Sequence, residues 1–279
     1  MKASESMADL SGQEYNWRVV LNAGEAEASE VLSRDRVWNC FALADLAPPF
    51  GQYTEVAVAY HAERPPAACL LLRHPAFTVL SPAGDSAGVE AILARLDLPA
   101  RTAIQAQALH LAALDKYYRP VEPSQELIRM YVRPATFRPV SPAGSIRRLT
   151  PSDLEAVLEL YRLFPENVFR PDELEHGLYY GLYDGQQLAA IGGTHVLAPA
   201  YRISVLGGIF THPDHRRRGY SQQLTGQLVS DLLALGCDEV VLNVFAANTP
   251  AIQLYQKLGF QSHCHYWNIE AELSIAGKA

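Results

Sequence analysis

A proline-rich segment near the middle of the chain constrains its fold more than any other sequence feature. Residues 133–144 (RPATFRPVSPAG) hold three prolines and a glycine, and proline imposes a backbone geometry that neither a helix interior nor a central strand accepts. The length of 279 residues also suits two domains, since one domain usually holds roughly 100 to 200 residues. We therefore predict a first domain at 17–134 and a second at 145–279, with a linker at 135–144 and a loose tail at 1–16.

The composition predicts a globular protein that binds neither nucleic acid nor a membrane. Hydrophobic residues make up 49% of the chain and charged residues 19%, which is enough apolar material for a packed core. The net charge of -7 disfavours nonspecific binding to phosphate-rich partners, because such binding needs clustered lysine and arginine. The four cysteines stand singly, without a C-x-x-C pair, so we expect a reducing, cytoplasmic location. No metal site is predicted.

The second half of the chain alternates strand-like and helix-like segments. Thr150, Pro151 and Asp153 form a helix start, with an N-cap hydroxyl, a proline at the first helical position and a following acid. The predicted class is therefore mixed α/β. Strands are expected at 145–149, 178–183, 187–197, 203–211, 239–245 and 261–273, and helices from 151, at 221–235 and at 250–258.

The first half repeats this rhythm more faintly. It begins with an amphipathic stretch at 31–46 and ends with a strand at 126–132. The similar order of segments predicts two copies of one fold, of which the first has lost its site. The other expected strands lie at 55–60, 67–73 and 77–81, and the helical patterns at 86–96 and 102–117.

The most informative run is 208–221 (GIFTHPDHRRRGYS), in which a buried strand enters a basic turn and then a helix. The first backbone N–H groups of a helix are unpaired and carry partial positive charge, so they form a ready anion site. Gly219 has no side chain to keep a phosphate away from the backbone, and the run Arg216 to Arg218 adds local positive charge. The run therefore predicts a diphosphate-binding site.

Two motifs in this half resemble one known family. The pattern Pro213-x-x-Arg216-x-x-Gly219-x-Ser221 is similar to the acetyl-CoA pyrophosphate loop of the GCN5-related N-acetyltransferases, although Ser221 stands where the family has glycine or alanine. The segment 243–260 (NVFAANTPAIQLYQKLGF) resembles the strand, loop and helix that follow in that family. The resemblance covers about 145–273. It implies an acyl-CoA N-acyltransferase fold, with a mixed, mostly antiparallel central sheet flanked by helices, and acetyl-CoA as the cofactor.

The resemblance also implies roles for individual residues. Tyr255 corresponds to the usual proton donor, which protonates the departing thiolate, and Asn248 to a cofactor-contacting position. Many relatives place a glutamate base on one of two splayed strands, but Asn243 stands at that position here and cannot accept a proton. The residues expected to contact the cofactor are Ile209, Phe210, Thr211, Arg216, Arg217, Arg218, Gly219, Tyr220, Ser221, Gln222, Asn243 and Asn248.

The sequence does not determine which residue is the general base. His195, on the preceding expected strand, is the nearest candidate, with His263 and His265 on the last strand as alternatives and a water chain as a further one. An amine with a pKa near roughly 10.4 must lose a proton before it attacks.

The leading functional hypothesis is an acetyl-CoA-dependent N-acetyltransferase, in which a primary amine of a small molecule or peptide attacks directly in a ternary complex. The tandem arrangement is similar to mycothiol synthases and, more loosely, to glycine N-acyltransferases, which favours small acceptors. The alternative is a regulatory module that binds acetyl-CoA without turnover. The sequence leaves the acceptor and the choice between monomer and homodimer open.

Overall fold

The computed structural model describes residues 17–140, 146–165, 167 and 169–274. The expected tail at 1–16 and residues 141–144 of the expected linker lie outside the described residues. The described residues form two compact units. Among the described residues, unit 1 draws on 17–34, 50–124 and 269–274, and unit 2 on 35–49 and on the described part of 125–268.

Unit 1 is a sheet with three helices. Its strands follow the order β1-β2-β3-β4-β5, and the end of the last strand, β13 (Gln261–Leu273), continues this order and pairs with β6. The elements are β1 (Arg18–Val20), α1 (Glu25–Leu32), β2 (Thr54–Tyr60), β3 (Ala67–His74), β4 (Phe77–Gly84), α3 (Ser86–Leu93), β5 (Arg101–Ala106), α4 (Ala108–Leu114) and β6 (Tyr118–Pro120).

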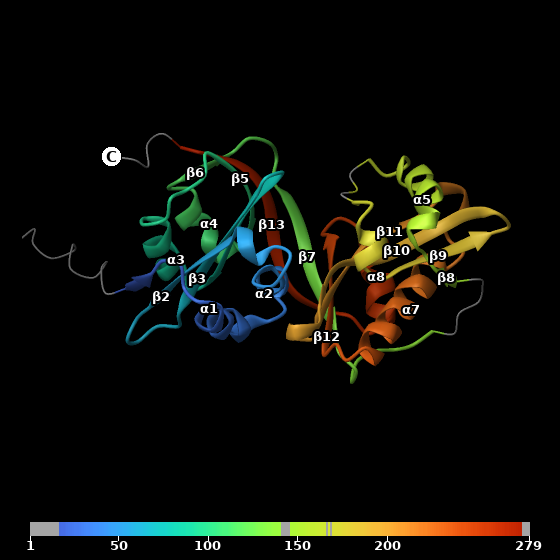
Figure 1. Ribbon diagram of the computed structural model, residues 1–279, viewed down its shortest axis with the longest axis horizontal. Coiled ribbons are helices and arrows are strands. Elements are labelled where there is room, and N and C mark those ends of the chain that lie inside the picture. The colour runs from blue at the N-terminus through green and yellow to red at the C-terminus, as the bar shows by residue number, and fades with distance from the viewer. Residues whose placement is uncertain (1–16, 141–145, 166, 168, 275–279) are drawn as a thin grey trace, which may run out of the picture. The chain divides into compact units, whose positions relative to one another are not determined.

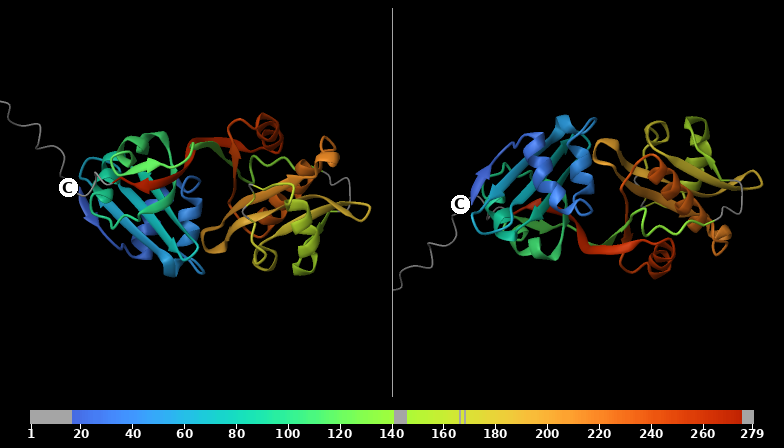
Figure 2. Two further views of the ribbon diagram at one scale, coloured as in Figure 1. Left: turned by 90° about the horizontal axis from the view of Figure 1, so that it is seen from above. Right: turned by 90° about the horizontal axis from the view of Figure 1, so that it is seen from below.

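Unit 2 is a larger sheet of order β13-β7-β12-β11-β10-β9-β8, to which β13 contributes its first part. In Figure 2 the red strand β13 runs beside the green strand β7, with which it pairs antiparallel. The other elements are α2 (Cys40–Asp45), β7 (Gln125–Val132), β8 (Ile146–Arg148), α5 (Leu154–Tyr161), α6 (Glu173–His176), β9 (Tyr179–Asp184), β10 (Gln187–Ala198), β11 (Ile203–Thr211), α7 (Tyr220–Ala234), β12 (Glu239–Phe245) and α8 (Thr249–Lys257).

The expected repetition of one fold stays a prediction, which the element order and pairing of the two units support. In each unit three antiparallel pairings are followed by one parallel pairing, β4 with β5 in unit 1 and β11 with β12 in unit 2. A helix connects the two parallel strands in both cases, α3 in unit 1 and α7 in unit 2. The mixed, mostly antiparallel sheet flanked by helices is thus the observed fold class.

The compact units do not follow the expected boundary at 134. Strand β7 precedes that boundary, yet it lies between β12 and β13 in the sheet of unit 2 and pairs antiparallel with both. The register joins Asn243 to Arg129 on one side and His265 to Ile128 on the other. A central strand of unit 2 is therefore supplied by residues that precede the expected domain boundary.

One predicted element of unit 1 is wrong. The helix expected at 102–117 is instead a strand, β5, followed by the short helix α4. Alanine, glutamine and leucine give this segment good helix propensity, but Thr102, Ile104 and Ala106 alternate with more exposed residues and are buried in the sheet. Parallel pairing with β4 therefore overrides the local preference.

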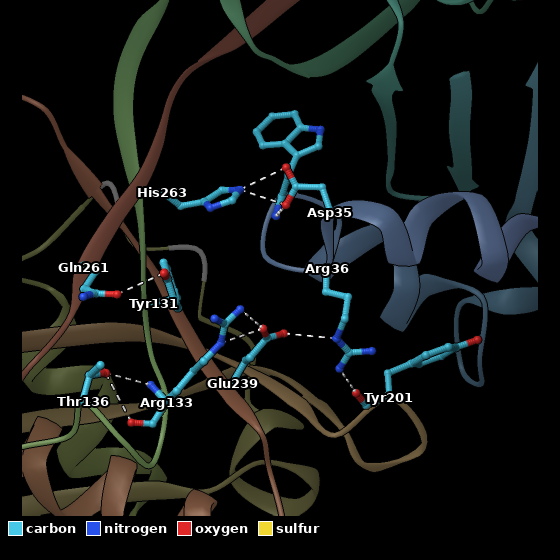
Figure 3. Close-up of polar contacts among 10 residues, drawn as sticks. Asp35, Arg36, Tyr131, Arg133, Thr136, Tyr201, Glu239, Gln261 and His263 are labelled. Atoms are coloured by element: carbon cyan, nitrogen blue, oxygen red, sulfur yellow. Dashed lines mark hydrogen bonds and ion pairs between the residues drawn. The ribbon is translucent and has the colours of Figure 1, made fainter. Parts of the chain in front are cut away.

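Charged contacts hold the segment Asp35–Pro49 to the rest of unit 2 (Figure 3). The buried carboxylate of Glu239 bridges two arginines, Arg36 at 3.2 Å and Arg133 at 2.6 Å. Arg36 also donates to the carbonyl of Tyr201 at 2.6 Å. These contacts attach a segment of the first half to the beginning of strands β11 and β12.

Helices cover both faces of the unit 2 sheet (Figure 1). On one face α7 and α8 pack through an apolar core that includes Leu228, Leu242 and Tyr255. On the other face α5 packs through Leu160 and Tyr161 against residues of β9 and β10. Among the described residues, no helix has the length and apolar character needed to span a bilayer.

Candidate active site

The two parallel strands of unit 2 separate part-way along their length. Strands β11 and β12 pair from Ile203 with Glu239 to Leu206 with Leu242. Beyond that point β11 remains paired with β10, and β12 remains paired with β7. The backbone edges of 207–211 and 243–245 are therefore unpaired with each other within the described part of the chain. An extended ligand could hydrogen-bond to both edges.

Two glycines begin the separation. Gly208 has a φ of 60°, a left-handed conformation that favours glycine. The hydroxyl of Tyr161, on α5, donates to the Gly208 carbonyl at 2.6 Å. A Cβ atom placed on Gly207 would lie 1.8 Å from the ring of His195, so only glycine leaves room for that imidazole. The glycine pair thus leaves space for Tyr161 and His195 at the point where the strands diverge.

The bend between β11 and α7 exposes a series of backbone donors. Arg217 and Gly219 have φ values of 63° and 78°, and Gly219, as the N-cap of α7, provides no side-chain cap. Among the described residues, no backbone carbonyl accepts a hydrogen bond from the N–H groups of 217–222, whereas Gln223 donates to the Gly219 carbonyl. Residues 216–219 are exposed. Uncapped helix N-termini of this kind bind anions.

Side chains around the bend hold it in place. Arg218 forms an ion pair with Asp184 at 2.7 Å, and the Thr211 and Ser221 hydroxyls hydrogen-bond at 2.8 Å. The serine that departs from the family pattern thereby ties the end of β11 to the first turn of α7. The guanidinium of Arg216 lies 6.0 Å from the centre of the Phe210 ring.

Tyr255 lies on α8, which follows β12, and Asn248 is the N-cap of that helix. Tyr255 is 8% exposed and packs against Phe260, and burial raises the pKa of its phenol to about 12. The phenol therefore remains protonated throughout the working range of pH. Asn248 caps α8, since its side-chain oxygen accepts a hydrogen bond from the backbone N–H of Ala251 at 3.3 Å.

Asn243 is engaged by a buried arginine. Its side-chain oxygen accepts a hydrogen bond from Nε of Arg129 at 3.0 Å, and Arg129 is 1% exposed. The guanidinium lies over the rings of Trp38 and Tyr266, 4.7 Å from each centre. Arg129, on β7, therefore orients the Asn243 side chain. The sequence did not indicate this role of Arg129.

The three candidate histidines have different surroundings. His195 Nδ1 lies 3.9 Å from the carboxylate of Glu173, and its ring borders Gly207. His263 contacts Asp35 at 2.8 Å and His265 contacts Glu126 at 2.8 Å. Both of these lie on β13, which is separated from β12 by β7. Of the three, only His195 lies at the strand separation.

Sequence reasoning missed Glu173 and Tyr161. Glu173 lies in a helix of only four residues, too short to give a periodic pattern. A signal was nevertheless present in the glycine pairs at 192–193 and 207–208, which lie on neighbouring strands and leave space for large rings. Such paired glycines indicate that aromatic or imidazole side chains cross the sheet at that level.

The geometry fits the diphosphate and arm of an acyl-CoA. The bend has several unpaired backbone donors and local arginines, and the separated strands have free edges next to it. The acetyltransferase (GNAT) family model matches residues 146–260. The [ribosomal protein bS18]-alanine N-acetyltransferase of Escherichia coli (strain K12) is 31% identical over 122 residues, 42% of this chain and 80% of that protein.

This chain belongs to the GNAT acetyltransferase family. It is therefore an acyltransferase, and its relatives include enzymes named as N-acetyltransferases. GNAT folds also cover nearly the whole chain. A GCN5-related N-acetyltransferase from Sphaerobacter thermophilus is 17% identical with a TM-score of 0.54, covering 93% of this chain and 96% of that one. A Drosophila protein, 13% identical, reaches a TM-score of 0.64 and covers 91% and 98%.

Proposed function

We propose that this GNAT member transfers an acetyl group from acetyl-CoA to a primary amine, by direct attack in a ternary complex. The observation that carries the proposal is the run of N–H groups at 217–222, which donate to no backbone carbonyl of the described residues, at the uncapped start of α7. Bound acetyl-CoA would supply the thioester that the amine attacks. Backbone groups of Ile209, Phe210 and Thr211 would hold the arm along the free edge of β11, and Asn248 would contact it from α8.

The same residues suggest how the chain promotes the reaction. A backbone N–H near Phe210 or Thr211 would stabilise the carbonyl oxygen as it gains charge. The protonated phenol of Tyr255 would donate its proton to the departing thiolate. His195, at the strand separation, would accept the proton of the amine. Each role belongs to a residue at or beside the separated strands, where the acyl group would lie.

The acceptor is an amine of a small molecule or peptide. Similarity to enzymes named for acetylating an alanine of a ribosomal protein favours a peptide α-amine. An α-amine has a pKa near roughly 7.7 to 8.0, against about 10.4 for a lysine amine. A larger fraction of an α-amine is therefore already deprotonated near neutral pH. Because the cysteines are single, a reducing cytoplasmic location is part of this proposal.

Calorimetry with CoA and acetyl-CoA, followed by a thiol-release assay with a panel of amines, tests the proposal. We expect binding, and release that depends on an acceptor, with peptides bearing a free N-terminal alanine in the panel beside polyamines and amino acids. Binding without release for every amine would favour the alternative, a regulatory module. Absence of binding would refute both.

A further inference from the structure

A buried carboxylate lies behind the candidate base. Glu173, the first residue of α6, is 9% exposed. Its Oε2 accepts a short hydrogen bond from the Tyr179 hydroxyl and lies 3.9 Å from Nδ1 of His195. Its other oxygen, Oε1, lies 4.0 Å from Nε of Arg170. A buried carboxylate needs hydrogen-bonding or charged partners, and Tyr179 fixes the oxygen that faces the histidine.

The opposite edge of the imidazole faces the strand separation. A Cβ atom on Gly207 would lie 2.0 Å from Nε2 of His195 and 1.8 Å from its Cδ2. Gly207 immediately follows Leu206, the last residue of β11 that pairs with β12. The ring therefore extends from Glu173 at Nδ1 to the edge of β11 at Nε2, and its side chain remains 25% exposed.

We infer that Glu173 is the positioning residue for His195, and that the pair acts as the general base of this enzyme. The inference rests on the proposed acetyl transfer. The proton leaves the acceptor nitrogen and forms a new N–H bond at Nε2, so the imidazole becomes a cation. The carboxylate of Glu173, 3.9 Å from Nδ1, stabilises that cation as its ion-pair partner. The pair thereby takes over the role for which Asn243 is unsuited.

Other titratable groups lie near the pair. Tyr161, on α5, hydrogen-bonds to Gly208, and burial raises the pKa of its phenol well above the usual value, with Glu173 adding to the effect. Strand β11 has no titratable side chain between Ile203 and Thr211. Helix α7 packs over Gly192, and its Asp231 accepts from Tyr180.

Asp45 is the competing candidate. Helix α2 contacts both β10 and β11, and burial raises the pKa of Asp45, its last residue, to about 7. A carboxyl group that titrates near neutrality could also accept an amine proton. The experiment therefore needs an Asp45→Asn arm beside the variants of the pair.

The test compares pH profiles of acetyl transfer for Glu173→Gln, His195→Gln, the double variant and Asp45→Asn. Glu175→Gln is the matched control, because Glu175 lies on the same helix and is exposed. For His195→Gln we expect kcat to fall about a hundredfold and the acid limb of the profile to disappear. For Glu173→Gln we expect kcat to fall about tenfold, with the acid limb displaced to lower pH, because the cation loses its partner. The double variant should be no slower than His195→Gln.

A second measurement does not depend on turnover. Diethyl pyrocarbonate modifies neutral imidazole, and peptide mass spectrometry follows its reaction at His195 against pH. We expect the modification midpoint of Glu173→Gln to lie below that of wild type, with that of Glu175→Gln unchanged. Calorimetry with acetyl-CoA should give the same affinity for all variants, since the binding bend is at 217–222.

The outcomes separate the two proposals. An unchanged midpoint and pH profile in Glu173→Gln would overturn the positioning role, as would loss of the acid limb in Asp45→Asn with its retention in His195→Gln. Failure of wild type to acetylate any amine, together with a displaced midpoint in Glu173→Gln, would instead reject the proposed function and leave the Glu173 to His195 contact established.

Discussion

Helices α7 and α3 begin at the same place in their units, each between two parallel strands, but their N-termini differ. Helix α7 starts from Gly219, which has no side chain to cap it. Helix α3 starts from Asp85, whose carboxylate accepts from the N–H groups of Ala87 at 2.9 Å and Gly88 at 3.2 Å. The N-terminus of α3 is therefore capped by a carboxylate of unit 1 itself, whereas the N-terminus of α7 has no side-chain cap.

The surroundings extend the contrast. In unit 1 the carboxylate of Asp85 is paired with Arg64 at 2.9 Å, and the buried His110 hydrogen-bonds to the carbonyl of Gly84 at 3.0 Å. A Cβ atom on Gly84 would lie 2.2 Å from the Pro66 carbonyl oxygen, so the chain closes tightly there. Side chains and a tight backbone approach thus occupy the place in unit 1 that corresponds to the bend before α7. This supports the interpretation of unit 1 as a degenerate copy, which we keep as a proposal.

The strongest test of the contrast is Gly219→Glu. It places a carboxylate where α3 has one, at a backbone φ of 78° that side chains rarely adopt. We expect the affinity for CoA, measured by calorimetry, to fall by at least about a thousandfold, because the new anion would occupy the donors and repel the diphosphate.

Gly236→Glu is the matched control for that variant. Gly236 has a φ of 95° and follows the other end of α7, with open space around it. It carries a similar backbone strain without touching the donors. Equal loss of CoA affinity in both variants would show that strain, and not the site, is responsible.

Helix α8 precedes β13 in unit 2, and α4 precedes β6 in unit 1. The two helices differ at their seventh residue. In α8 this residue is Tyr255, and in α4 it is Leu114. We expect Tyr255→Phe to lower kcat about a hundredfold with little change in the affinity for acetyl-CoA. Tyr131→Phe, which removes a hydroxyl bonded to Gln261 on β13, should retain full activity.

The raised pKa of Tyr255 gives a pH prediction. A proton donor loses its proton as the pH rises through its pKa, and burial raises the pKa of Tyr255 to about 12. We therefore expect no alkaline decline of kcat from this group up to about pH 10. A decline near pH 9 that disappears in Tyr255→Phe would contradict the raised pKa of this phenol.

A smaller effect is expected from the exposed arginines. Arg218 is already paired with Asp184, whereas Arg217 lies at the turn itself with a φ of 63°. We expect Arg217→Gln to weaken CoA binding about fivefold, and less at high salt, because exposed charges are screened. Arg64→Gln, next to the capped helix of unit 1, should leave CoA binding unchanged.

The smallest effect concerns unit 1 alone. Asp85→Ala removes the cap of α3 and should lower the free energy of unfolding by about 1 kcal/mol, measured by urea denaturation. CoA binding and kcat should not change. Asp97→Ala is the control, since that side chain is 92% exposed. Loss of CoA affinity in Asp85→Ala would show that unit 1 takes part in binding.

The sequence predicted the local structure of unit 2 well where one signal dominated. The strands Ile203–Thr211, Glu239–Phe245 and Gln261–Leu273 have the expected bounds, because apolar runs there end at clear turn residues. The roles assigned to 209–222, Asn248 and Tyr255 stay predictions, and the geometry of the bend supports them. Helix propensity misled the interpretation of Arg101–Ala106, where pairing with a distant strand decides the conformation.

Contacts between distant segments were beyond local reasoning. No periodic pattern tells that β7 lies between β12 and β13, or that Arg129 reaches Asn243. Glu173 likewise comes to His195 only through the fold of α6 and β10. The sequence therefore located the bend at 216–222, which is local, and missed the carboxylate beside His195, which depends on tertiary packing.

The position of β7 has a consequence for how such a gene can be divided. A fragment encoding only 145–279 would leave β12 and β13 without the strand between them, with rows of backbone amides exposed and prone to aggregate. A fragment ending at 134 would lack the last strand of unit 1. Recombination that exchanged one half for a homologous half would have to preserve both interlocked strands, so the two halves are expected to be inherited, expressed and engineered as one piece.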